Sequence, residues 1–449
     1  NGGMGVDSKY YDLTLNSSDI TGKASAKLDG YGDWSVNVKY SDDDTEKIES
    51  TLIKGSPFAY TTFANRDSVE LNVNNLVKFL DKNGSEIITE DGKEVTIDHF
   101  LVETENESEA PGDGNKKQYH YYGIYLPENS KATKVGSKLK IKLGNNDNYV
   151  VIGALAVEEP IKLLASQSIS KPSLLRDGDA VKQLEYMYKY AYSYVTDTVV
   201  DYSYDDAKSI CTTTYKVSVS QKRTGSGISN STLLCMMPHQ WKYSDATYET
   251  TNGEALIYTS SRGDLRIHEG NEFSYSQKFN GIIPQYTTPS ESNSYEKEWM
   301  YAYLKQFTDS ALKSYWVADP YWEGKKSHPI AMGILIADQL GEYETRDKLI
   351  DVLKKIMANW LTYDGDEDYP YYMYYHTSWG AVSGDGGDHG MAINLSDHHF
   401  LWAYFIFPAA VLASYDSTFV DDYGEMIELL IRDCMNPDKN DDRLPFMRN

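Results

Sequence analysis

The feature that most constrains the fold is a change of hydrophobic period near residue 295. Before about residue 175, short runs alternate apolar and polar residues, and Gly, Asn and Asp cluster between the runs. This pattern is typical of β-strands joined by turns. After residue 295, apolar residues recur at helical spacing, as at Leu349, Val352, Ile356 and Trp360. The sequence therefore predicts a β-structured domain followed by a helical domain.

Residues 1–265 are expected to form one large β-sandwich, because many short strands follow one another at close spacing. One helix is expected as an insertion at 179–196, where Leu184, Tyr188, Tyr192 and Val195 recur at helical spacing. The runs that predict strands are 34–40, 58–63, 69–73, 119–125, 139–143, 149–152, 210–220, 231–237 and 255–260.

Residues 266–294 are expected to be a mixed α/β connector, and residues 295–449 a helical domain. Gly341 stands where a helix C-cap belongs, and Pro408 should kink or split the helix that contains it. The apolar stripes predict helices at 296–315, 329–340, 345–361, 397–415 and 421–435. Helices joined by long loops in this way predict part of an α/α toroid.

The charge of the chain limits its partners. The 43 Lys and Arg residues stand against 67 Asp and Glu residues, for a net charge of −24. Because phosphate groups need a basic surface, a nucleic-acid partner is not expected, and neither is an anionic membrane. No apolar run is long enough to span a bilayer. A neutral polysaccharide fits, and export is expected although the first residues do not read as a signal peptide.

The chain is rich in Tyr and Trp, with 38 and 8 residues. Their flat faces with a polar edge suit stacking on sugar rings, but Tyr is also favoured on β-sheet faces. Cys211, Cys235 and Cys434 are odd in number and lack CxxC spacing, so they indicate neither a disulfide framework nor a zinc site. No metal and no cofactor are expected.

Two aromatic segments are candidates for ligand contact. Residues 319–326, DPYWEGKK, precede the second predicted helix and form either a sugar platform or an ordinary loop. In the first case Tyr321 and Trp322 would stack on sugars and Lys325 would bind hydroxyls. Residues 369–379, YPYYMYYHTSW, would send alternate rings to opposite faces of a strand. His376 and Trp379 are the candidates there, with aromatic packing as the alternative.

Asp397, His398 and His399 stand in a row before a long apolar segment. A metal site is weakly supported, because adjacent residues of a helix point about 100° apart. Asp is a favoured helix N-cap, and this interpretation is preferred on the residues alone. A catalytic acid must be protonated, whereas a helix N-terminus favours the charged carboxylate. Burial or a neighbouring carboxylate would have to compensate.

Several motifs resemble glycoside hydrolase family 81, the endo-β-1,3-glucanases. The catalytic signature is matched by SGDGGD at 383–388, DHHF at 397–400 and YFI at 404–406. Other matching stretches are GDWSV at 32–36, KGSPFAY at 54–60, LCMMPHQW at 234–241 and TSWG at 377–380. The chain departs from the family pattern at 401–403, where the family has His-Tyr-Gly, and at His376, where it has Asp. The matches extend over nearly the whole chain in the family's order.

The resemblance implies a β-sandwich, a small α/β connector and an (α/α)6 barrel, incomplete at residue 449. It implies endo-acting hydrolysis of β-1,3-glucosidic bonds in laminarin-type glucans with inversion. A secreted, monomeric protein is also expected. Asp397 would be the general acid, and the general-base Glu is expected beyond residue 449. His398 and His399 would orient Asp397 or bind a hydroxyl, and Tyr404 would contact substrate. The alternatives are a non-catalytic β-glucan-binding protein and a polysaccharide lyase, although a lyase acting on uronates would need basic residues.

Overall fold

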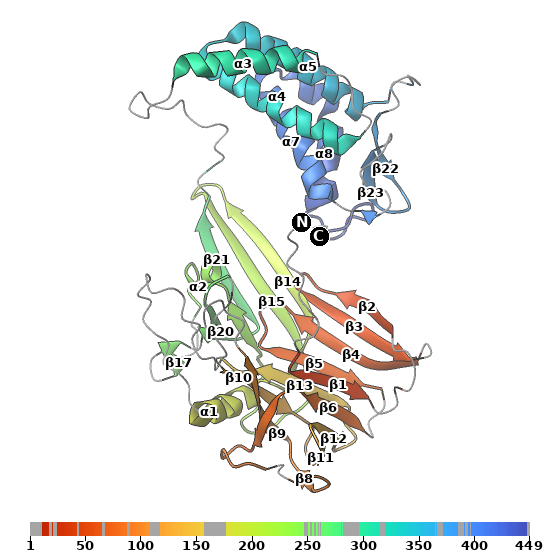
Figure 1. The fold of residues 1–449 in the computed structure, drawn as a ribbon, viewed down its shortest axis with the longest axis vertical. Coiled ribbons are helices and arrows are strands. Elements are labelled where there is room, and N and C mark those ends of the chain that lie inside the picture. Colours follow the sequence, from red (N-terminus) through yellow and green to blue (C-terminus); the bar gives the residue numbers. More distant parts are fainter. Residues whose placement is uncertain are drawn as a thin grey trace. The chain divides into compact units, whose positions relative to one another are not determined.

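The computed structural model divides the chain into two compact units, Asn1–Asn280 and Gly281–Asn449, which are described separately (Figure 1). The residues it describes are 11–17, 20, 25–42, 45–64, 68–87, 90–107, 117–156, 177–246, 250–251, 254–255, 257–258, 260, 262–279, 281, 296–313, 319–363, 365, 371–384, 390, 394–395 and 397–446.

The first unit contains the predicted β-sandwich. A five-stranded antiparallel sheet has the order β1-β6-β12-β11-β8 and faces an eight-stranded sheet with the order β2-β3-β4-β5-β13-β10-β9-β7. Leu71 and Ile141 from the smaller sheet and Phe100 and Ile124 from the larger sheet are buried in one shared core. The strands are β1 (Leu13–Ser17), β2 (Ser25–Tyr31), β3 (Ser35–Asp42), β4 (Thr45–Ile53), β5 (Phe58–Phe63), β6 (Val69–Val73), β7 (Leu76–Leu80), β8 (Glu94–Thr96), β9 (His99–Glu107), β10 (Lys117–Tyr125), β11 (Lys131–Val135), β12 (Lys138–Lys142) and β13 (Tyr149–Ala154).

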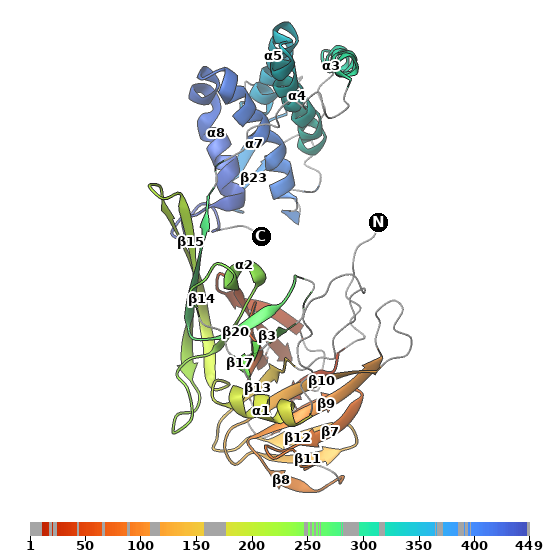
Figure 2. The same cartoon turned by 90° about the vertical axis from the view of Figure 1, so that its left-hand side faces the viewer.

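The other face of the eight-stranded sheet is also covered. Tyr60, Tyr125 and Val151 of this sheet share a second core with Leu184 of helix α1 and Ile267 of strand β20. Figure 2 shows α1 beside β9 and β10. The covering elements are α1 (Asp177–Tyr188), β14 (Ser193–Asp205), β15 (Ile210–Gln221), β16 (Leu233–Met236), α2 (Pro238–Trp241), β17 (Thr250–Thr251), β18 (Glu254–Ala255), β19 (Ile257–Tyr258), β20 (Leu265–Glu269) and β21 (Glu272–Lys278).

Two expectations for this unit differ from the structure. The helix expected at 179–196 ends at Tyr188, and β14 begins at Ser193. Tyr192 and Val195 are buried in the same core as the helix, so their helical spacing reflects burial on both elements. The stretch expected as a connector from residue 266 instead contains β20 and β21, which pair with β16 and β15. These strands complete two three-stranded sheets within the first unit.

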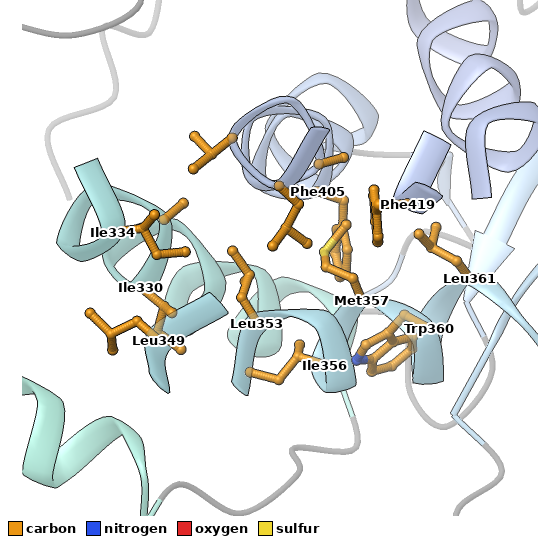
Figure 3. Packing of buried hydrophobic residues seen from close by; sticks show 14 of the residues in the cluster. Ile330, Ile334, Leu349, Leu353, Ile356, Met357, Trp360, Leu361, Phe405 and Phe419 are labelled. Atoms are coloured by element: carbon orange, nitrogen blue, oxygen red, sulfur yellow. The ribbon is translucent and has the colours of Figure 1, made fainter. Parts of the chain in front are cut away.

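The second unit packs helices α3 (Lys297–Ala311), α4 (Pro320–Leu340), α5 (Tyr343–Leu361), α7 (His398–Tyr415) and α8 (Thr418–Met435) around an apolar core. A hairpin of β22 (Met373–His376) and β23 (Ala381–Gly384) belongs to the same unit. Figure 3 shows the centre of this core, where Ile330, Leu353, Met357, Trp360 and Phe405 lie on α4, α5 and α7. The predicted strands and helices give the observed combination of β-sheets and a helical unit.

The start of α4 corrects the sequence interpretation. Residues 319–326 are the cap and first turns of the helix, not a loop before it. The Asp319 carboxylate accepts hydrogen bonds from the backbone N–H groups of Tyr321 and Trp322, at 2.8 and 3.2 Å. Pro329 lies inside α4, and Pro408 lies inside α7 without splitting it. Gly341 ends α4 in the left-handed conformation, with φ of 75°, as predicted.

Candidate active site

Asp397 occupies the N-cap position of α7, as its place before the apolar segment predicts. Its carbonyl oxygen accepts the first helical hydrogen bond, from the N–H of Leu401 at 2.9 Å. Its carboxylate makes no capping hydrogen bond to the described residues, and the side chain is exposed. The preferred sequence interpretation, a side-chain cap, is therefore wrong, and the carboxylate is left available for other chemistry.

The backbone of Asp397 is unusual for this position. An N-cap residue normally has β-region dihedral angles, whereas Asp397 is left-handed, with φ of 60° and ψ of 16°. Leu395 also has a positive φ, of 49°. Such conformations are uncommon outside glycine and often occur at functional sites. Residues 385–389 of the SGDGGD motif lie outside the described residues.

His398 is turned into the protein interior, where it meets a buried carboxylate on α8. Its Nδ1 forms a hydrogen bond with Asp433 Oδ2, which also accepts one from Trp402 Nε1 at 2.7 Å. The other carboxylate oxygen of Asp433 accepts from the backbone N–H of Val382 on β23, at 3.0 Å. His398 is 2% exposed, and Asp433 and Trp402 are 0% exposed. This network joins α7, α8 and β23.

Asp433 is the buried charge of the network. Burial alone would raise the pKa of its carboxyl, but the hydrogen bonds from His398, Trp402 and Val382 outweigh it and hold the pKa of Asp433 below the usual value. The thiol of Cys434 also points to the His398 carbonyl oxygen, at 3.6 Å. The His398 Nε2 atom is buried and has no hydrogen-bond partner among the described residues. The described residues contain no cluster of His, Cys, Asp and Glu suited to a metal ion.

An aromatic cluster lies on the neighbouring helix. The Lys325 ammonium lies 4.6 Å from the ring centre of Tyr321 and 4.9 Å from that of Trp322. A hydrogen bond with Tyr321 raises the pKa of Lys325 above its ordinary value. The rings of Tyr321 and Tyr404 meet edge to face at 5.9 Å, which brings α4 and α7 together. The structure thus groups four of the predicted site residues.

Two glycines permit this convergence. A Cβ atom at Gly324 would stand 2.6 Å from the Cβ of Tyr404, so the two helix backbones can approach this closely only without a side chain there. A Cβ atom at Gly384 would lie 3.0 Å from Pro320 Cγ, so β23 ends beside the start of α4. The start of α4, the first turns of α7 and the end of β23 therefore converge.

His376 and Trp379 form a pair at the tip of the β22–β23 hairpin. Their rings stack with centres 4.5 Å apart and planes at 22°. Trp379 is 44% exposed, which leaves one surface available to a ligand. The hairpin is held to the end of the chain, where the hydroxyl of Tyr375 donates to the Arg443 carbonyl oxygen at 2.5 Å. This pair belongs to the hairpin, whereas the aromatic cluster lies on α4 and α7.

The remaining predicted residues face outward. His399 is exposed, and Phe400 is 64% exposed. The sequence analysis did not identify Asp433 as a site residue, because it lies 35 residues after His398 and belongs to no motif. Its one sequence signal was a charge within the apolar stripe of α8.

No helix in the described part of the chain is long and apolar enough to cross a membrane.

The architecture defines a β-sandwich protein with a helical unit that carries an exposed carboxylate at the start of α7 and an aromatic cluster on α4 and α7. Residues 291–449 match the glycosyl hydrolase family 81 C-terminal domain. A glucan endo-1,3-beta-D-glucosidase from Thermobifida fusca is 28% identical over 95% of this chain and 48% of its own length. Another from Acetivibrio thermocellus is 28% identical over 98% of this chain and 49% of its own length.

A solved structure agrees with these sequence similarities. A glycoside hydrolase family 81 protein from Clostridium thermocellum superposes with a TM-score of 0.71 at 27% identity, over 98% of this chain and 54% of that one. Residues 291–449 thus correspond to a glycosyl hydrolase family 81 C-terminal domain, and nearly the whole chain is similar to proteins of that family. It spans about half the length of the relatives that it matches.

Proposed function

We propose that this chain hydrolyses internal β-1,3-glucosidic bonds of laminarin-type glucans with inversion of configuration, and that Asp397 is the general acid. The observation that carries the proposal is the Asp397 carboxylate, which is exposed at the start of α7 and is not used as a helix cap. The curated relatives are glucan endo-1,3-beta-D-glucosidases, which supports the choice of substrate.

The surroundings of Asp397 suit a sugar chain. Tyr404 lies on α7, six residues after the first helical residue His398, which corresponds to about 9 Å along the helix axis. Tyr404 contacts Tyr321, and Lys325 lies over the rings of Tyr321 and Trp322. Flat rings with polar edges can pack against the apolar faces of glucose units, while the ammonium donates to hydroxyl groups. These residues would bind glucose units next to the bond that is cleaved.

In an inverting glycosidase, the acid protonates the leaving oxygen while water attacks C1 from the opposite face. A second carboxylate, about 6.5–9.5 Å from the acid, takes a proton from that water. We assign this role to the general-base Glu that the family resemblance implies. His399, exposed beside Asp397, would bind a glucose hydroxyl. An (α/α)6 barrel, secretion and a monomeric state are parts of the same proposal.

Asp397→Asn tests the acid directly. Asn has nearly the same shape and also tolerates a left-handed backbone, but it cannot donate a proton to the leaving oxygen. We expect reducing-sugar release from laminarin to fall by about 10²–10⁴-fold, with circular dichroism and laminarin binding unchanged. Asp421→Asn, on the exposed surface of α8, is the matched control and should retain full activity. Full activity of Asp397→Asn would rule out this assignment.

Sodium azide tests the role of the general acid independently of the general base. Azide can attack C1 without losing a proton, so an α-glucosyl azide forms while the proton of Asp397 goes to the leaving oxygen and the C1–O bond breaks. This product should appear with the wild-type chain and be lost in Asp397→Asn.

A non-catalytic glucan-binding function is the second candidate, because the cluster of Tyr321, Trp322, Lys325 and Tyr404 would bind a glucan without any acid. Laminarin binding by the wild-type chain, with neither sugar release nor azide product, would contradict the hydrolase and favour this function.

A further inference from the structure

The first turn of α7 is not stabilised in the usual way. A helix that begins with Asp normally has this residue in the β region, with its carboxylate accepting from the N–H of the second or third helical residue. For Asp397 these donors would be His399 and Phe400. The described structure instead has Asp397 left-handed, without a capping hydrogen bond. Other contacts must therefore hold this turn.

Those contacts converge on the next residue, His398. Its ring is anchored through Nδ1 to Asp433, and its carbonyl oxygen faces the thiol of Cys434. Asp433 is itself fixed by Trp402 and by the backbone of Val382. All of these side chains are buried, and Asp433 comes from a different helix. The position of the His398 Cα atom is thus set by the interior of the unit.

This anchor matters for Asp397 because the two residues share a peptide bond. If His398 were free to turn, Asp397 would be expected to relax to the β region, where it avoids the left-handed conformation and gains a capping hydrogen bond. A capping carboxylate is stabilised in its charged form by the helix N-terminus. It is also directed toward the helix, away from a ligand. Both changes would impair a proton donor.

We propose that Asp433, acting through His398, is a positioning residue that keeps the Asp397 carboxylate away from the N-terminus of α7. The catalytic part of this inference rests on the proposed role of Asp397 as the general acid. The structural part, a left-handed Asp397 that depends on the buried His398–Asp433 pair, stands independently.

Two substitutions of His398 distinguish the anchor from mere packing. His398→Leu keeps the apolar volume but removes the hydrogen bond to Asp433. His398→Asn keeps an N–H donor close to the position of Nδ1, so it should preserve the anchor. Trp360→Phe is the control: Trp360 is a fully buried side chain of the same core and is not part of the His398–Asp433 network. Asp433→Asn, which keeps the side-chain volume, replaces His398→Leu if that variant does not fold.

The first measurement is structural and needs no activity. In a crystal structure of His398→Leu, Asp397 should have left the left-handed conformation, with its carboxylate bonded to the N–H of His399 or Phe400 or with the first turn unwound. In His398→Asn and Trp360→Phe, φ of Asp397 should stay positive. A left-handed Asp397 retained in His398→Leu would overturn the inference.

The second measurement is kinetic, on laminarin with the full chain. His398→Leu should lower kcat by tenfold or more while KM stays within threefold, and His398→Asn should restore most of kcat. Trp360→Phe should keep both constants even if its thermal stability falls. Equal kcat values for His398→Leu and the wild type would refute the catalytic part. A wild-type chain without hydrolysis or azide product would refute the proposed function, while the crystal structures would still decide the positioning role.

Discussion

Replacing Gly324 with alanine should separate α4 from α7 at the candidate site. The new Cβ atom would lie 2.6 Å from Tyr404 Cβ and 3.3 Å from two ring carbons of Tyr404. Carbon atoms prefer about 3.5–4.0 Å, so the helices must move apart by about 1 Å. Because the Tyr404 Cβ is attached to the backbone, a change of rotamer cannot relieve this contact.

The cost can be worked out from two opposing terms. Overpacking a core costs about 1–3 kcal/mol, and the upper part of this range applies because the helix backbone itself must shift. Alanine is favoured over glycine in a helix interior by about 1 kcal/mol. We therefore expect a net loss of about 2 kcal/mol in the free energy of unfolding of the helical unit.

Gly333 provides a matched control in the same helix. Its added Cβ would meet Phe307 Cε1 at 3.0 Å and Leu349 Cδ1 at 3.1 Å, which are the ends of side chains that can adjust. Gly333→Ala has the same gain in helix propensity, so it should be close to neutral. The difference between the two variants isolates the backbone contact.

The assay is hydrogen exchange of the slowest amides of α4, which reports the stability of this unit within the full chain, together with laminarin binding by calorimetry. Gly324→Ala should show faster exchange and weaker binding, because Tyr321 and Tyr404 are pushed apart. Equal stability of the two variants, or a more stable Gly324→Ala, would show that the α4–α7 contact is not as tight as the structure indicates.

Two further predictions concern side chains of either unit. Trp322→Ala should weaken laminarin binding about fivefold, by roughly 1 kcal/mol, without loss of stability, since Trp322 is 51% exposed; Trp299→Ala, at a similarly exposed position of α3, should leave binding unchanged. The Nδ1 atom of His99 lies 2.7 Å from Asp98 Oδ1, and its Nε2 atom lies 2.6 Å from Glu185 Oε1. Burial lowers the pKa of His99, but these hydrogen bonds outweigh it and raise the pKa above its ordinary value of about 6.5. The interaction of His99 with the two carboxylates therefore stabilises the first unit fully below about pH 6.5, and this stabilisation is lost as the pH rises through the raised pKa. In urea unfolding of the first unit, His99→Gln should make the free energy of unfolding less dependent on pH in this range. An unchanged pH dependence would contradict the prediction.

Much of the fold follows from local pattern. Strands β5 and β6 and helix α5 were predicted within two residues, because their apolar periods are regular and their ends carry turn residues or caps. The start of α4 was missed, since Pro329 was taken as the beginning of the helix. The better signal was Asp319 followed by Pro320, an N-cap with proline at the first helical position.

The site was less predictable than the fold. The position of Asp397 at the start of α7 follows from the apolar segment after it, but its left-handed backbone does not, because no residue near it demands this conformation. The partner of His398 comes from another helix, and no sequence period links Asp433 to it. Likewise, the contact of Tyr321 with Tyr404 depends on how α4 packs on α7.

The left-handed backbone of Asp397 also restricts which amino acids can occupy this position. Glutamate carries the same acid group, but its longer side chain gives no local hydrogen bonding to offset a positive φ, whereas Asp, Asn and Gly adopt this conformation readily. The backbone conformation at this position therefore favours Asp over Glu as the acid. Exchanging the acid for a longer one would require the entry into α7 to be rebuilt first.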